Sequence, residues 1–372
     1  MLLGVPKEVK VHEYRVGMTP ASVREVINHG HEVLMETGAG LGVGASDEDY
    51  KSAGAGIADT AEDVFARADM IVKVKEPQAG ERALLRPGQI LFTYLHLAPD
   101  PEQTKDLVES GAICVAYETV TDDSRGLPLL APMSQVAGRM SIQAGAHCLE
   151  KAQGGSGTLI AGVPGVAPAK VVIIGGGVVG ENAAYMAIGL GADVTVLDRN
   201  VDTMRALVVR FGNSVKTLYS TALTIEEEVL QADLVIGGVL VPGAAAPKLV
   251  SRDQISRMKP GSVLVDVAID QGGCFETSKA TTHADPTYIV DEVVHYCVAN
   301  MPGGVARTST YALNNVTLPF ILAIADKGVN KALLDDPHLL AGLNVYRGKV
   351  TYKAVAEDLG YDYADPKSTL AA

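Results

Sequence analysis

One segment near the middle of the chain constrains the fold more than any other. It reads Lys170-Val-Val-Ile-Ile-Gly175-Gly-Gly177-Val-Val-Gly180, a short apolar run that leads into a G-x-G-x-x-G pattern. Such a run predicts a buried strand, and the glycines after it predict a tight turn into a helix. A second run, Asp193-Val-Thr-Val-Leu-Asp198, ends in an acid 18 residues after Gly180. This order of elements predicts a dinucleotide-binding unit.

Each residue of the pattern has its own physical role. Gly175 permits the tight turn, Gly177 lets a pyrophosphate approach the helix N-terminus, and Gly180 allows close helix–strand packing. Asp198 would accept hydrogen bonds from ribose hydroxyls and repel a 2′-phosphate, which favours NAD over NADP. Arg199 beside it weakens that preference, because arginine can bind a phosphate. The alternative interpretation is a glycine-rich turn that binds no ligand.

Apolar runs alternate with helical patterns along most of the chain. The predicted strands are 31–35, 70–74, 89–94, 112–116, 170–174, 193–198, 215–219, 234–237 and 262–266, and the predicted helices include 134–151, 179–190, 201–210, 225–230 and 310–324. Thr19 before Pro20 and the segment Ser46–Asp49 are helix N-terminal signals. The alternation predicts an α/β fold of two Rossmann-like, doubly wound parallel-sheet domains with a cleft between them.

Two Gly/Pro-rich junctions, 126–132 and 300–304, suggest where the domains meet. We therefore predict an NAD-binding Rossmann domain at 129–306. It is inserted into a discontinuous substrate domain, made of 1–128 plus 307–372. The Gly- and Pro-rich stretch 154–169 is expected to be a surface loop.

Composition excludes several classes of function. The net charge of −13 argues against nucleic-acid binding, because such a surface repels phosphate backbones. No apolar stretch reaches the ~20 residues of a membrane span, and the N-terminus lacks the basic region of a signal peptide. The cysteines are far apart and form no CxxC or Cys/His cluster, which predicts neither a metal site nor disulfides and fits a reducing cytoplasm. They are Cys114, Cys148, Cys274 and Cys297.

Polar residues at the ends of the predicted strands are candidates for chemistry. Lys75 ends the run 70–75 with Lys73 on the same predicted face, His96 ends 90–96, and Asp270 follows 262–270. In parallel sheets, ligands lie beyond the carboxyl ends of the strands, so these residues could converge. Arg15 lies in the loop before the helix that starts at Pro20.

Each candidate also has a structural alternative. Lys75 could be a solvated strand end, His96 a structural histidine, Asp270 a turn residue and Arg15 a surface charge. Glu8 and Glu13 could be salt-bridge partners of Arg15.

Six motifs together resemble the bacterial alanine dehydrogenase family, which is related to the NAD-binding part of proton-translocating transhydrogenase. They are GVPKEVKVHEYRVGMTP, VKVKEP, YLHLAP, APMSQVAGRMSIQAGAHCLEK, GGGVVG and DVAIDQGG, and they span essentially the whole chain. The resemblance implies a cytoplasmic, usually hexameric enzyme of amino-acid catabolism. It would catalyse the NAD-dependent, reversible conversion of L-alanine to pyruvate and ammonium.

The same resemblance assigns roles to individual residues. Arg15 and Lys75 would bind the substrate carboxylate and carbonyl, and His96 and Asp270 would form the acid/base pair. The residues implied around NAD, beyond the glycines, are Ser134, Val178, Asp198, Ser220, Val239, Leu240, Val267, Asn300 and Met301. A guanidinium fork suits a carboxylate, and an imidazole exchanges protons near neutral pH.

Two other hypotheses remain open from the sequence. One is a soluble NAD(H)-binding subunit of a proton-translocating transhydrogenase. Such a subunit would need a membrane partner and would not react with amino acids. The other is an NAD-sensing or structural oligomer without turnover.

Overall fold

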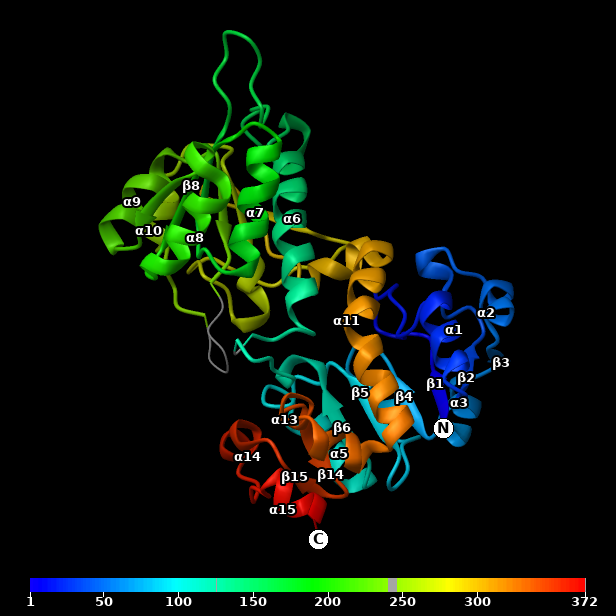
Figure 1. The fold of residues 1–372 in the computed structure, drawn as a ribbon. Helices are drawn as coiled ribbons and strands as arrows, with labels where there is room; N and C mark the ends of the chain where they lie inside the picture. Colours follow the sequence, from blue (N-terminus) through cyan, green and yellow to red (C-terminus); the bar gives the residue numbers. More distant parts are fainter. Residues whose placement is uncertain (125, 240–245, 372) are drawn as a thin grey trace. The chain divides into compact units, whose positions relative to one another are not determined.

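The computed structural model describes residues 1–124, 126–239 and 246–371 of the chain. These residues form two compact units, Met1–Met133 with Gly303–Ala372, and Ser134–Pro302 (Figure 1). Each unit has one sheet in which parallel pairs predominate, with helices between successive strands. The predicted α/β class with two parallel-sheet domains is therefore confirmed.

The first unit contains, within the described residues, an eight-stranded sheet. Its order is β15 (Lys349–Val350), β14 (Leu343–Tyr346), β6 (Ile113–Ala116), β5 (Ile90–Thr93), β4 (Met70–Val72), β1 (Leu2–Val5), β2 (Glu32–Glu36) and β3 (Gly56–Ala58). Strands β1 to β6 are parallel, whereas β14 and β15 add antiparallel strands at one edge.

Helices of the first unit begin where the sequence provides caps. The Thr19 hydroxyl accepts from the Ser22 amide, with Pro20 at the first helical position, and Ser46 and Asp49 form a capping box, as predicted. The helices are α1 (Pro20–Asn28), α2 (Asp47–Ala53), α3 (Ala61–Arg67), α4 (Ala79–Arg82), α5 (Pro101–Ser110), α11 (Ala306–Lys327), α12 (Val329–Asp335), α13 (Pro337–Leu340), α14 (Lys353–Leu359) and α15 (Pro366–Ala371).

The second unit contains a seven-stranded sheet in its described part. Its order is β12 (Thr287–Val290), β13 (Val293–Tyr296), β11 (Val263–Asp266), β10 (Leu234–Gly237), β7 (Lys170–Ile174), β8 (Asp193–Asp198) and β9 (Lys216–Tyr219), and only the β12–β13 pair is antiparallel. Its helices are α6 (Ala131–Cys148), α7 (Val178–Gly189), α8 (Val201–Phe211), α9 (Ala222–Gln231) and α10 (Arg252–Ser256).

Both sheets share one parallel topology. Numbering the six parallel strands of each unit in chain order gives the spatial order 3-2-1-4-5-6, which is that of doubly wound dinucleotide-binding folds. The order reverses between β1 and β4 in the first unit, and between β7 and β10 in the second. Ligands of such sheets bind beyond the carboxyl ends of the strands at this point.

Alternating side chains of the strands fill two cores per unit. In β5, Ile90 and Phe92 pack into one core and Leu91 into the other. In β7, Val171 and Ile173 pack on one face of the sheet, and Val172 and Ile174 pack on the other. Because both faces are covered, central strands read as continuous apolar runs. In the described residues, no helix has the length and apolar character required to cross a membrane.

Lys73 lies in the core of the first unit rather than at a solvated strand end. Strand β4 ends at Val72, so the alternation that placed Lys73 on the same face as Lys75 does not extend there. The Lys73 ammonium contacts Glu81 at 2.5 Å and Glu8 at 3.2 Å, and its side chain is fully buried. Burial opposes its charge, but the two carboxylates outweigh that effect and raise the pKa of Lys73.

We predict that Lys73→Met lowers the free energy of unfolding of the first unit by about 3–5 kcal/mol. Methionine keeps most of the volume, but it leaves the carboxylates of Glu8 and Glu81 buried without a cation. Urea unfolding followed by circular dichroism measures the change. Lys105→Ala, which removes an exposed partner of Glu109, is the control, and we expect a change within about 0.5 kcal/mol. Equal effects of the two substitutions would contradict the prediction.

Candidate active site

The glycine turn between β7 and α7 has the geometry that its sequence predicts. Gly175 has a φ of +99°, in the region that favours glycine. A Cβ on Gly180 would lie 1.8 Å from the carbonyl oxygen of Gly175, so helix and strand pack too closely for any side chain there. Gly177 is the N-cap of α7, and a Cβ on it would meet nothing within 4 Å. Open space in front of a 12-residue helix is where a pyrophosphate binds.

Asp198, the last residue of β8, joins this turn to the next loop. Its carboxylate accepts from the amide of Gly176 at 2.6 Å and from the amide of Asn200 at 2.7 Å. Each oxygen of a carboxylate can accept a second hydrogen bond, so a ribose hydroxyl can still bind. The neighbouring Arg199 is exposed.

The residues that the resemblance implies around NAD belong to the second unit. Ser220, Val239 and Val267 follow the carboxyl ends of β9, β10 and β11, the same sheet edge as the glycine turn. Asn300, with a φ of +63°, and the buried Met301 follow β13 farther along the chain. Val178 opens α7 and is 42% exposed. Ser134 lies in α6, and Leu240 lies outside the described residues.

Helix α6 packs directly on the helix that follows the glycine turn. A Cβ on Gly138 would lie 2.2 Å from the carbonyl oxygen of Val179, so the two backbones are in contact. Arg139 donates to the side chain of Asn182 at 3.0 Å and lies over the Tyr185 ring. The small residues of α6 therefore serve close packing against α7.

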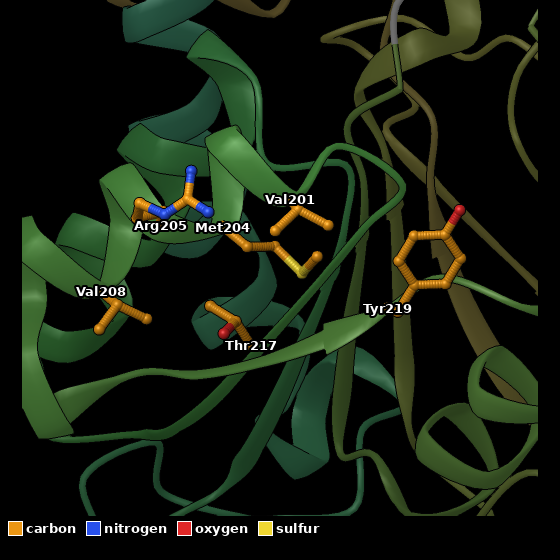
Figure 2. Close-up of a pocket in the computed structure, with 6 residues that line it drawn as sticks. All are labelled: Val201, Met204, Arg205, Val208, Thr217 and Tyr219. Carbon is orange, nitrogen blue, oxygen red and sulfur yellow. The ribbon is translucent and has the colours of Figure 1, made fainter.

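A shallow hollow lies beside the edge strand β9 (Figure 2). Its side chains come from α8 and β9, and they are Val201, Met204, Arg205, Val208, Thr217 and Tyr219. None of the site residues predicted from the sequence lines it, but Tyr219 ends β9 and Val201 opens α8 after β8, so the hollow adjoins the carboxyl-end region described above.

Asp270 lies on a 3₁₀ turn, Val267–Gln271, and not on the strand, which ends at Asp266. The Asp270 side chain is exposed. The buried Asp266 carboxylate anchors both ends of this loop, since it accepts from the amides of Ala268 at 3.1 Å and Cys274 at 2.8 Å. Burial raises the pKa of Asp266 against these hydrogen bonds.

The loop that carries Arg15 is fixed by a helix from the far end of the chain. The Asn314 side chain on α11 accepts from the Thr19 amide at 2.8 Å and donates to the Gly17 carbonyl at 3.1 Å. Thr310 accepts from the Val16 amide at 3.3 Å. A Cβ on Gly17 would lie 2.4 Å from the carbonyl oxygen of Val72, so the loop passes directly over the end of β4.

Arg15 is buried and is paired with Glu13. The carboxylate of Glu13 accepts from Nε at 2.7 Å and from Nη2 at 2.5 Å, while Nη1 contacts the sulfur of Met133 at 3.1 Å. Burial disfavours the guanidinium charge, but the hydrogen bonds and charge of Glu13 outweigh it and raise the pKa of Arg15. Of the two acids considered from the sequence, Glu13 is the partner, whereas Glu8 pairs with Lys73.

Lys75 lies three residues beyond the end of β4, in a segment whose backbone amides are bound by Glu8. Glu8 accepts from the amides of Val74 at 2.7 Å and Lys75 at 3.3 Å. The Lys75 ammonium lies 3.4 Å from the Glu76 carboxylate, and its side chain is 16% exposed. Despite burial, Lys75 and Lys10 lower the pKa of Glu76.

His96 follows β5 and turns outward. Its φ is +50° and its side chain is 46% exposed. The ring stacks on Tyr94 with centroids 5.9 Å apart, and Glu118 accepts a 2.6 Å hydrogen bond from the His96 amide. Sequence reasoning missed Glu118, although it follows the run 112–116 and the strand-end rule that selected His96 could have found it.

Three predicted residues thus lie at one sheet edge. Arg15, Lys75 and His96 follow β1, β4 and β5, which are neighbours in the first sheet. Adjacent strands are about 4.8 Å apart, so the carboxyl ends of these three strands lie within about 10 Å of one another. Asp270 belongs to the second unit. Within the described residues, no three His, Cys, Asp or Glu side chains are grouped to hold a metal ion, and the four cysteines are buried thiols.

Two family models match nearly the whole chain. The model described as "Alanine dehydrogenase/PNT, N-terminal domain" matches residues 4–137, and "Alanine dehydrogenase/PNT, C-terminal domain" matches residues 141–353. The alanine dehydrogenase of Halomonas elongata is 62% identical over 370 residues, covering 100% of both chains.

Solved structures agree with this relationship. A structure titled L-alanine dehydrogenase has a TM-score of 0.94 and 52% identity, covering 97% of this chain and 99% of that one. A transhydrogenase structure from Sinorhizobium meliloti has a TM-score of 0.81 and 27% identity, covering 95% and 100%. The resemblance inferred from the six motifs is confirmed.

We predict that Gly180→Ala destabilises the second unit by about 1–3 kcal/mol, because the new methyl group must push α7 away from the Gly175 carbonyl. Gly189→Ala in the same helix is the control, since a Cβ there meets nothing within 4 Å. We expect that change to be neutral or stabilising by up to about 1 kcal/mol. Thermal unfolding compares them, and a control that loses as much as Gly180→Ala would contradict the packing argument.

Proposed function

The chain belongs to the alanine dehydrogenase/pyridine nucleotide transhydrogenase family, and we propose that it catalyses the reversible, NAD-dependent oxidative deamination of L-alanine to pyruvate and ammonium. One observation supports this most directly: Arg15, Lys75 and His96 follow three neighbouring strands of one sheet, beside the switch point between β1 and β4. The relatives named alanine dehydrogenase match over the full length of the chain.

NAD fits the second unit on structural grounds. The space in front of α7 admits a pyrophosphate, and Gly175 and Gly180 bring the backbone close to that space. Asp198 is the last residue of β8. In folds of this topology, the adenosine ribose of a dinucleotide lies near the end of this strand. When bound, the nicotinamide supplies the hydride acceptor for alanine oxidation and the hydride donor for the reverse reaction.

Arg15 and Lys75 would orient the substrate. The guanidinium of Arg15 is already fixed by Glu13, so it does not have to be ordered when a carboxylate arrives. The Lys75 ammonium would donate to the carbonyl oxygen of pyruvate and stabilise the negative charge that develops there.

His96 and Asp270 would move the protons. In the direction of amination, His96 would donate a proton to the carbonyl oxygen of pyruvate as ammonia attacks the carbonyl carbon, and in the direction of oxidation it would take that proton back from the carbinolamine hydroxyl. In the direction of oxidation, the Asp270 carboxylate orients and deprotonates the water that attacks the imine. Asp270 lies in the second unit.

Location and assembly complete the proposal. Four buried thiols suit the reducing conditions of a cytoplasm. Assembly into homo-hexamers, which the resemblance implies, stays a prediction.

An initial-rate assay tests the function. We expect NADH oxidation to require both pyruvate and ammonium, and His96→Ala to lower kcat by about 10²- to 10⁴-fold. His147→Ala, which changes an exposed histidine in the last turn of α6, is the matched control and should retain activity. Hydride exchange between nucleotides without pyruvate would instead support a transhydrogenase subunit. Full activity of His96→Ala would remove its acid/base role.

A second prediction concerns cofactor choice. Asp198→Asn keeps the side-chain size but removes the charge that would repel a 2′-phosphate. We expect the ratio of kcat/KM for NADP to that for NAD to rise at least about tenfold. Asp202→Asn, on the exposed face of α8, should leave the ratio unchanged. An unchanged ratio in Asp198→Asn would show that this carboxylate does not select the cofactor.

A further inference from the structure

Glu118 has contacts that connect it to the proposed catalytic histidine through the backbone. We propose that Glu118 is a positioning residue: its carboxylate holds residues 95 and 96 in the turn that presents the His96 imidazole to the substrate. The proposal deepens the proposed function and rests on it.

The carboxylate of Glu118 binds two consecutive amides. Oε1 accepts from the His96 amide at 2.6 Å and from the Leu95 amide at 3.2 Å, and Oε2 lies 3.2 Å from the same Leu95 amide. Hydrogen bonds to a carboxylate are stronger than those between neutral groups. The Glu118 side chain is only 13% exposed, so water competes little for these donors.

The backbone of His96 has an unfavourable conformation that the surrounding contacts must stabilise. At a φ of +50°, the β-carbon of a non-glycine residue is crowded, and such a conformation persists only where the surroundings enforce it. On either side of His96, Leu95 and Leu97 are buried in the same core, so His96 alone projects outward. Glu118 therefore fixes the one exposed residue between two anchored neighbours.

The sheet register explains why this acid can reach the turn. Strands β5 and β6 are parallel neighbours, and Thr93 pairs with Ala116 at their carboxyl ends. The chains then continue side by side, which brings the 3₁₀ turn Tyr117–Thr119 next to residues 95 and 96. The Tyr94 ring, whose hydroxyl donates to the Leu129 carbonyl at 2.6 Å, lies parallel to the imidazole with its centroid 5.9 Å away.

The geometry favours action through the backbone over action on the imidazole. Oε1 of Glu118 lies 3.9 Å from Nδ1 of His96, beyond hydrogen-bond distance. A glutamine whose carbonyl oxygen takes the place of Oε1 would keep the hydrogen bonds that Oε1 accepts from both amides. It would lose the charge and the second acceptor, Oε2, near the Leu95 amide. Glu118→Gln therefore separates the two modes of action.

The experiment measures kcat and the KM for pyruvate in the wild type, Glu118→Gln, Glu118→Asp and Glu118→Ala, with circular dichroism to confirm folding. We expect kcat to fall about 10- to 100-fold in the Ala and Asp variants, with KM changed less than about threefold, because Arg15 and Lys75 still hold the substrate. Glu118→Gln should stay within about threefold of the wild type. If Glu118→Ala does not fold, the kcat and KM of Glu118→Asp alone are compared with those of the wild type and Glu118→Gln.

Two further measurements sharpen the outcome. Formate, added to Glu118→Ala, should restore part of the lost kcat by occupying the vacated acceptor position. Asp69→Asn is the control, since Asp69 accepts from the Leu2 amide at 2.8 Å at the opposite edge of the same sheet, and it should leave kcat unchanged. A wild type without alanine dehydrogenase activity would refute the proposed function. An active wild type whose Asp and Ala variants keep full kcat, or whose Gln variant falls as far as Ala, would overturn the positioning role alone.

Discussion

Parallel pairing of strands determines where chemistry can occur in both units. Because the six parallel strands of each sheet point in the same direction, the loops that follow their carboxyl ends all lie at the same edge of that sheet. The loops of Arg15, Lys75 and His96 share one such edge, and the glycine turn and Asp198 share the other. The residues come from separate loops of the chain, and the parallel sheet brings them to a common edge.

Carboxylates that accept from backbone amides fix the loops at both edges. Glu8 holds residues 74 and 75, Glu118 holds 95 and 96, Asp198 joins the glycine turn to the loop after β8, and Asp266 closes the loop of Asp270. A carboxylate offers several acceptor sites, so one side chain can satisfy amides that strands leave unpaired at their ends. These four carboxylates thus support loops that carry residues proposed to react or to bind the cofactor.

The sequence patterns predicted elements that depend on neighbouring residues, and they missed elements and contacts that depend on residues far away in the chain. The strands 170–174, 193–198 and 234–237 were predicted with the observed bounds, because each is an apolar run between turn residues. Strand β1 was missed because Pro6 cuts its run short, and β14 was missed because it exists only through antiparallel pairing with β6. The partner of Arg15 stayed open among two acids, because both lie within a few residues of it. The anchoring of the Arg15 loop by Asn314 has no local signal at all.

The contact between Asn314 and the Arg15 loop affects the order in which the two units can fold during translation. The second unit is one uninterrupted stretch, so it can fold as soon as it leaves the ribosome. The first unit must wait, because helix α11 and strand β14 are synthesised after the whole second unit. The nascent chain therefore carries an unanchored Arg15 loop until α11 has been made, and a product truncated before α11 could fold its second unit and still lack that anchor.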